Sequence, residues 1–173
     1  MEKVFSIVII VTIVEMILST IWNKIYFIVG IPIFVHEIPI KFIGSDRNSA
    51  LAIEYAMPDT KYAPMKFRQL SRNTIAFRES NWNGFFKNSY TPVMHGNLQY
   101  TERGNIKVTG LVNWFIIVFS FLFFYLSFRW SDENPIIFVF PLFLVVVLSW
   151  NICTQKKRFI NIAEIASGKI DHT

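Results

Sequence analysis

Three long apolar stretches dominate the pattern of hydrophobic and polar positions along the chain: Val4–Val35, Val108–Phe128 and Pro135–Cys153. The second and third contain no charged residue, and each is close to the roughly 20 residues that an α-helix needs to cross a bilayer. In the first stretch, Val4–Trp22 suits one crossing helix. The pattern predicts an α-helical membrane fold with three spans, at residues 4–22, 108–128 and 135–153.

A more polar region between the first two predicted spans predicts an inserted small, mainly β (α+β) domain over residues 25–109. Lys66–Leu70 and Thr74–Arg78 flank a short turn, which is typical of a hairpin. Val93–Thr101 and Ile106–Thr109 flank a second turn, where Gly104 supplies the positive φ that such a loop demands. Alternating apolar and polar positions give the predicted sheet one apolar face.

The remaining segments of this domain carry different signals. Ile25–Ile40 is apolar, but its one glycine and two prolines favour an extended edge strand or an interfacial segment over further helix. Ser49–Met57 predicts a short helix. A domain of this size buries little surface, so we expect the membrane or a partner subunit to complete its core.

Basic side chains near the predicted spans are distributed unevenly. An odd number of spans places the domain and the 154–173 tail together on one side of the membrane. The basic residues on the other side are Lys3 and Arg129. The basic residues on the side of the domain and tail are Lys24, Lys41, Arg103, Lys107, Lys156, Lys157, Arg158 and Lys169. The positive-inside rule then predicts a cytoplasmic (inner) membrane protein with its N-terminus outside and the domain and C-terminus in the cytoplasm. The alternative, an uncleaved signal anchor at Met1–Leu18, would export the domain.

The composition agrees with a membrane protein, because 53% of the residues are hydrophobic and the mean hydropathy is +0.39. The single cysteine, Cys153, excludes an internal disulfide. The net charge of +5 is modest and does not form a stripe within one domain. We therefore expect membrane lipids, and no nucleic acid, among the partners.

Glu15 is costly at the centre of the first predicted span, by about 2.5–3.5 kcal/mol on insertion. It shares one helix face with other polar side chains, and the second span carries a similar row at a seven-residue repeat. Together they predict an intramembrane polar seam, within the chain or with another subunit, formed by Thr12, Glu15, Ser19, Asn23, Asn113, Ser120 and Ser127. The alternative is an ion or proton path with Glu15 as its titrating site.

The segment after the third predicted span combines a basic run with an apolar stripe. Lys156, Lys157 and Arg158 are predicted to contact lipid headgroups. The helical stripe that follows is predicted to dock a partner through Phe159, Ile162, Ala166 and Ile170. The alternative is that the third helix extends and lies on the bilayer or on the chain's own domain.

No motif indicates catalysis, a cofactor or a metal. His36 and His95 lie far apart in the sequence, and no nucleophile elbow, phosphate-binding glycine loop or His-Glu-x-x-His run occurs. We therefore expect a non-catalytic integral membrane protein, an accessory or assembly subunit or a membrane-tethered interaction module, that binds another membrane protein subunit or its own copies. The alternatives are a small transport or channel component that uses Glu15, and a membrane-bound protective or sensor protein.

Overall fold

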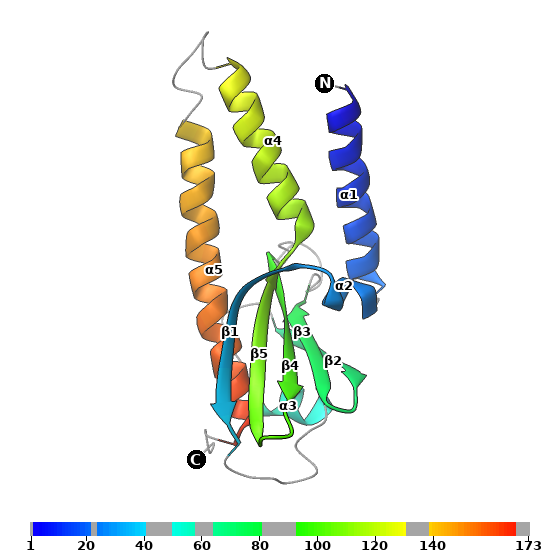
Figure 1. Cartoon of the computed structure of the whole chain (residues 1–173), viewed down its shortest axis with the longest axis vertical. Coiled ribbons are helices and arrows are strands. Elements are labelled where there is room, and N and C mark those ends of the chain that lie inside the picture. Colours follow the sequence, from blue (N-terminus) through cyan, green and yellow to red (C-terminus); the bar gives the residue numbers. More distant parts are fainter. Residues whose placement is uncertain are drawn as a thin grey trace.

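The computed structural model of the chain describes residues 2–21, 24–40, 50–57, 64–80, 93–130 and 139–168. The elements follow in the order α1 (Glu2–Thr20), α2 (Lys24–Ile28), β1 (Ile31–Pro39), α3 (Ala50–Ala56), β2 (Met65–Ser71), β3 (Thr74–Glu79), β4 (Met94–Tyr100), β5 (Asn105–Val112), α4 (Trp114–Trp130) and α5 (Val139–Ala166). Figure 1 shows α1, α4 and the first half of α5 at one end of the molecule and a β-sheet at the other. The second half of α5 continues along the sheet.

The mainly β domain predicted from the sequence is confirmed. The strands form one five-stranded antiparallel sheet in the order β1-β5-β4-β3-β2. Both predicted hairpins are present, because β2 pairs with β3 and β4 pairs with β5. Gly104, in the turn between β4 and β5, has a φ of 74°. Hairpins of this kind can be predicted because the turn and the alternation on both sides of it are local in the sequence.

The segment from Ile25 to Ile40 divides into a short helix and an edge strand. Lys24–Ile28 forms α2, and Ile31–Pro39 forms β1, which pairs with β5 at the edge of the described sheet. A proline stands near each end of β1, and an edge strand tolerates the missing N–H groups. The extended edge strand predicted there is confirmed over β1, and the predicted helix at Ser49–Met57 corresponds to α3.

Two glycines form a trough in the face of the sheet that α5 covers. Gly96 of β4 lies opposite Gly110 of β5, with Phe77 and Phe34 as their outer neighbours in register. A Cβ on either glycine would overlap the ring of the adjacent phenylalanine, so each ring occupies the space above its glycine. Phe159 of α5 packs against both rings, with centroid separations of 4.7 Å to Phe77 and 6.0 Å to Phe34. The trough thereby positions α5 on the sheet.

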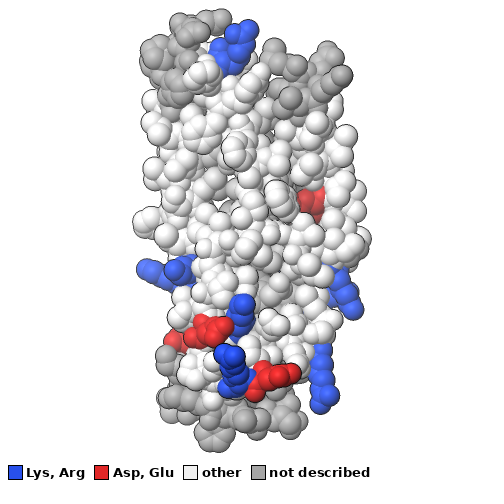
Figure 2. Space-filling view, viewed as in Figure 1, with Lys and Arg blue, Asp and Glu red and all other residues white. Residues whose placement is uncertain are grey.

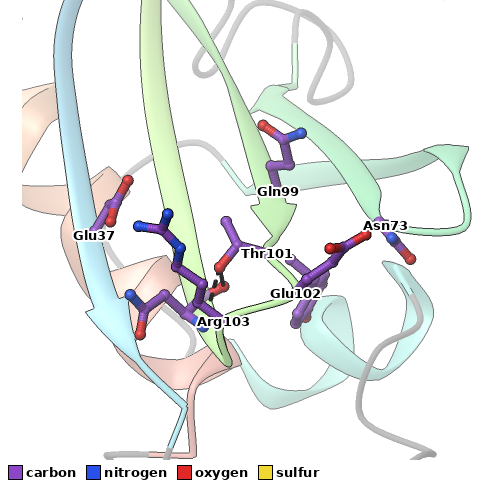
Figure 3. Close-up of a pocket in the computed structure, with 8 residues that line it drawn as sticks. Glu37, Asn73, Gln99, Thr101, Glu102 and Arg103 are labelled. Atoms are coloured by element: carbon purple, nitrogen blue, oxygen red, sulfur yellow. Dashed lines mark hydrogen bonds between the residues drawn. The ribbon is translucent and has the colours of Figure 1, made fainter.

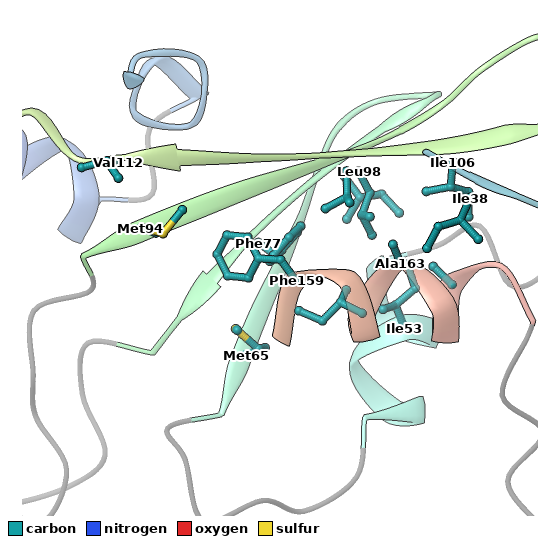
Figure 4. Packing of buried hydrophobic residues seen from close by; sticks show 14 of the residues in the cluster. Ile38, Ile53, Met65, Phe77, Met94, Leu98, Ile106, Val112, Phe159 and Ala163 are labelled. Atoms are coloured by element: carbon teal, nitrogen blue, oxygen red, sulfur yellow. The ribbon is translucent and has the colours of Figure 1, made fainter. Parts of the chain in front are cut away.

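The hydrophobic core lies between this face of the sheet and the helices α3 and α5 (Figure 4). Leu98 and Ile106 of the sheet, Ile53 of α3, and Phe159 and Ala163 of α5 are all buried in it. Burying a large apolar side chain stabilises a fold by about 1.5–3 kcal/mol. The second half of α5 is therefore part of the sheet domain.

The three-span fold predicted from the sequence is wrong. In the part of the chain that the structure describes, α5 is the one helix long and apolar enough to cross a bilayer. The predicted span at 108–128 fails because Val108–Val112 belong to β5, which leaves α4 with 17 residues. At 1.5 Å per residue α4 is about 25 Å long, less than the hydrocarbon core of about 30 Å.

The other two predicted spans also differ from the observed helices. Among the α1 residues whose side chains the structure describes, the apolar segment covers Ser6–Glu15, which is shorter than the roughly 20 residues of a crossing. α5 begins at Val139 and runs past Cys153 to Ala166, while residues 135–138 lie outside the described part of the chain. The observed architecture is a five-stranded antiparallel sheet with helices, and not a domain inserted into a bundle of three spans.

Candidate functional site

The helices expose a large apolar surface. We define the helical end as α1, α4 and residues 139–154 of α5. Its most exposed large side chains include Phe121 at 72%, Phe128 at 74%, Phe143 at 67% and Trp150 at 76%. Figure 2 shows this end as nearly free of charge, whereas Lys, Arg, Asp and Glu gather around the sheet. Soluble monomers rarely expose so continuous an apolar surface, which usually contacts protein or lipid.

Glu15, in α1, is buried within this apolar end (8% exposed). Its carboxylate accepts two hydrogen bonds from the start of α4, from Trp114 N–H to Oε1 (2.9 Å) and from Phe115 N–H to Oε2 (2.5 Å). The first N–H groups of a helix have no acceptor within it, and they carry a partial positive charge. Glu15 therefore caps α4 from a distant part of the chain and ties α1 to it.

A cluster of polar side chains fills the junction between the helical end and the sheet. Asn113, between β5 and α4, accepts at Oδ1 from Tyr26 O–H (3.3 Å) and from His95 Nδ1 (2.7 Å). Because an amide oxygen only accepts, His95 carries its proton on Nδ1. The Tyr26 ring lies 4.6 Å from that of His95, and the Arg78 guanidinium lies 5.6 Å from the Tyr26 ring centroid.

Burial sets the protonation states in this cluster. It lowers the pKa of His95 to about 4, against the opposing hydrogen bond with Asn113, so the imidazole is neutral at pH 7. It raises the pKa of Tyr26 to about 12, although the neighbouring Arg78 charge opposes this shift. General acid–base catalysis works best when the pKa lies near the operating pH. Neither group meets that condition, so the arrangement favours a structural role.

An apolar cavity of about 250 Å³ opens beside Glu15. Glu15 and Tyr26 form its polar wall, and the remaining lining comes from the side chains of Ile10, Val11, Val14, Leu18, Val29 and Trp114. Both carboxylate oxygens of Glu15 already accept backbone N–H groups. The cavity therefore continues the apolar surface of the helical end and offers few polar contacts.

The predicted polar seam contains hydroxyls that bond within their own helices. Thr12 Oγ1 donates to the carbonyl of Val8 (2.8 Å), and Ser120 Oγ donates to that of Ile116 (2.7 Å). Such i to i−4 bonds satisfy the hydroxyl without linking two helices. The hydrogen bonds of Thr12 and Ser120 therefore do not link α1 to α4.

The other seam residues lie in different settings. Asn113 precedes α4 and belongs to the junction cluster, and Ser127 is buried in α4. The side chain of Ser19 and all of Asn23 lie outside the described part of the structure. Of the predicted seam, the structure brings Glu15 and Asn113 to the start of α4, where one accepts from the helix backbone and the other precedes it.

The predicted headgroup-contact residues divide into two kinds. Lys156 and Lys157 are exposed on α5. Arg158 instead forms an ion pair with the buried carboxylate of Glu79 on β3, and its side chain is 16% exposed. The guanidinium therefore fastens α5 to the sheet and is not available to a headgroup.

The predicted docking stripe lies inside the chain's own core. Phe159, Ile162 and Ala166 are buried against the sheet, with exposed fractions of 0%, 0% and 8%. Side chains covered in this way cannot contact a partner at the same time. The arrangement corresponds to the alternative in which the helix extends onto its own domain, and Ile170 lies outside the described residues.

A polar cavity lies at the opposite end of the sheet (Figure 3). It measures about 430 Å³ and is lined by residues of β1, β4, β5 and two turns: Glu37, Asn73, Gln99, Tyr100, Thr101, Glu102, Arg103 and Asn105. Thr101 Oγ1 accepts from Asn105 N–H (3.2 Å), which closes the turn that carries Arg103. Across the described residues, no group of three or more His, Cys, Asp or Glu side chains could hold a metal ion.

Reasoning from sequence missed the junction cluster and the Glu79–Arg158 pair. Arg78 and His95 stand on β3 and β4 at positions opposite each other in register. Their side chains face α2, on the side of the sheet away from α5. The sequence signal for this cluster is a polar residue at a strand position that faces a helix. It can be recognised only when the helix that covers that face, here α2, is known.

Comparison of the chain with protein-family models, with curated proteins and with solved structures finds no match.

Proposed function

We propose that this chain is a non-catalytic, membrane-associated protein that holds a small β domain at a bilayer surface, where the domain binds a protein partner as an accessory or assembly subunit. The observation that carries the proposal is the separation of exposed apolar side chains on the helical end from charged side chains around the sheet. α5 as a whole has the length and composition of a span, but its second half packs on the sheet, so the part that enters the bilayer is residues 139–154, next to α4.

The charge distribution supports a cytoplasmic sheet domain. Lys24, Lys107, Lys156 and Lys157 lie at or below the junction, while Arg129 is the one basic side chain described at the far end of α4. Cytoplasmic flanks of membrane helices carry an excess of basic residues. We therefore propose that the sheet faces the cytoplasm. The test places a cysteine at exposed Gln99 in a Cys153→Ser background and treats intact cells with an impermeant thiol reagent. Labelling of that cysteine from outside would contradict the proposal.

The fold also bears on the choice between interaction and transport. The Glu15 carboxylate accepts hydrogen bonds from two backbone N–H groups at the start of α4. Protonating this carboxylate, or binding a cation to it, would therefore weaken the fold. The sheet face opposite α5 carries Glu37, Lys107 and Gln99 in one row across β1, β5 and β4. Polar side chains on the outer face of a sheet suit a binding surface, and they support the accessory role over transport.

A pair of matched double substitutions tests the membrane association. Phe143→Asp with Val146→Asp places two charges on the helical end, at positions 67% and 65% exposed. The control, Leu51→Asp with Tyr55→Asp, places two charges on α3 at positions 68% and 88% exposed. Each Asp in a membrane helix costs about 2.5–3.5 kcal/mol, so the first pair opposes insertion by roughly 5–7 kcal/mol.

The measurement is the share of tagged protein that stays in the membrane pellet after alkaline carbonate extraction. We expect the wild-type chain and the α3 control in the pellet and the α5 pair in the supernatant. Release of the wild-type chain by carbonate, or equal retention of both pairs, would contradict membrane insertion through the helical end. Mild-detergent purification then identifies a stoichiometric partner, whereas a chain that purifies only with its own copies would favour transport.

A further inference from the structure

Three exposed lysines lie where the helical end meets the sheet. Lys24 begins α2, and Lys156 and Lys157 stand on α5 immediately before Arg158, which pairs with Glu79 of the sheet. Figure 1 shows α2 and α5 on opposite sides of this junction, and Figure 2 shows basic patches on both sides at the edge of the uncharged region. We call Lys24, Lys156 and Lys157 the boundary lysines.

No carboxylate in the described part of the chain neutralises the boundary lysines. Among the residues that the structure describes, none of the three forms an ion pair with a carboxylate, in contrast to Lys66 with Glu54 and Arg158 with Glu79. The ammonium of Lys156 lies 5.8 Å from the ring centroid of Phe34, which holds the side chain close to the sheet. The three exposed charges are therefore open to an external anion.

Their position relative to the apolar surface selects the kind of anion. Trp150 is 76% exposed and stands six residues before Lys156 on α5, which places it about 9 Å further into the helical end. Tryptophan and lysine in this order are typical of the interface of a bilayer, where the indole sits at the headgroups and the lysine stem reaches outward. A soluble anion would meet the lysines but not the adjoining apolar surface.

We propose that the boundary lysines bind the headgroups of anionic phospholipids and so select these lipids over zwitterionic ones around the protein. The inference rests on the proposed membrane association of the helical end. A zwitterionic headgroup carries its own ammonium beside the phosphate, which repels lysine, whereas an anionic headgroup presents net negative charge. Arg158, which the sequence also suggested for this role, is excluded because Glu79 already binds it.

The experiment measures lipid selectivity by tryptophan quenching. The full chain is reconstituted in phosphatidylcholine vesicles that contain the same mole fraction of either brominated phosphatidylglycerol or brominated phosphatidylcholine. Bromine quenches the indole of a tryptophan that contacts the labelled lipid. The other four tryptophans are replaced by phenylalanine in every chain compared, so the signal comes from Trp150, which lies near Lys156 and Lys157 on α5.

Two triple variants are compared with the wild-type chain. Lys24→Gln, Lys156→Gln and Lys157→Gln together remove the boundary charges, and the control removes three exposed basic charges from the sheet domain through Lys66→Gln, Arg72→Gln and Arg103→Gln. Each lysine near an anionic surface strengthens binding by roughly fivefold. We expect the wild-type chain and the control to prefer the anionic lipid by fivefold or more at low salt, and the boundary variant to show no preference.

The preference should also fall towards unity in 1 M NaCl, where the Debye length is about 3 Å. Equal quenching by the two lipids in the wild-type chain would overturn the inference while leaving membrane association intact. A preference that survives the boundary substitutions would overturn it as well. Quenching by neither lipid would overturn the proposed membrane association, and this inference with it.

Discussion

Removing the carboxylate of Glu15 should weaken the whole helical end, because this one side chain satisfies two backbone donors of another helix. The Trp114 and Phe115 N–H groups donate to its two oxygens at 2.9 and 2.5 Å, and the carboxylate is 8% exposed. In Glu15→Leu both donors lose their acceptor in a buried site. Each unsatisfied buried donor costs about 1–3 kcal/mol, so the expected loss of stability is roughly 2–6 kcal/mol.

Glu15→Gln separates the effect of charge from that of shape. The amide keeps one acceptor oxygen but turns an NH₂ group towards the second backbone N–H, and it loses the favourable charge at the helix N-terminus. One missing bond and about 0.3–1 kcal/mol of dipole interaction give an expected loss of roughly 1–3 kcal/mol, less than for Leu. Ser120→Ala is the control, because its hydroxyl bonds only within α4, and we expect a change of about 0.5 kcal/mol or less.

The assay is denaturant unfolding in a mild detergent, followed by circular dichroism, with amide hydrogen exchange read at positions 114 and 115. We expect the order of stability wild type, Gln, Leu, and faster exchange of these two amides in both Glu15 variants. If the free energy of unfolding of Glu15→Leu lies within about 0.5 kcal/mol of that of the Ser120→Ala control, the capping role of Glu15 is wrong.

Two further predictions concern the sheet. Gly96→Ala places a Cβ in the space of the Phe77 ring and should destabilise the fold by about 1–3 kcal/mol, whereas Gln99→Ala on the same strand should change little; equal unfolding midpoints for the two would refute the trough. His95 has a folded pKa of about 4, below its unfolded value of about 6.5, so the unfolded state binds the proton first. The contribution of neutral His95 to the free energy of unfolding is fully present above pH 6.5. It is lost as the pH falls towards 4, by roughly 3 kcal/mol in total. His95→Gln, which can still donate to Asn113, should flatten the unfolding free energy between pH 6.5 and 4, and an unchanged slope would contradict the neutral, buried imidazole.

Local signals determined the β part of this protein. Three signals can each be recognised within a few residues of sequence: the turn at Gly104, the alternation in the paired strands and the prolines of β1. They predict the two hairpins and the edge strand because a hairpin is closed by its own turn and a proline is excluded from a central strand. None of these inferences needs knowledge of what packs against the sheet.

The extent of the helices was decided by tertiary contacts. Residues Val108–Val112 are as apolar as the α4 residues that follow, and composition alone reads both as one membrane span. They form a strand because Gly110 and Val112 pair with Gly96 and Met94 of β4, while the other side of β5 pairs with β1. A buried strand and a membrane helix both require apolar residues, so hydropathy does not distinguish them.

The roles of individual polar residues also depended on partners far away in the sequence. The stripe that contains Glu15 marked a polar position on α1. The groups that donate to its carboxylate are backbone N–H groups at the start of α4, 99 residues later. Likewise the apolar stripe around Phe159 indicated a surface to be covered, and the sheet trough at Gly96 and Gly110 covers it. Sequence determined that these groups need a partner, because a buried charge and an apolar face are each costly when left alone, and only the fold decided that the partner is the chain itself.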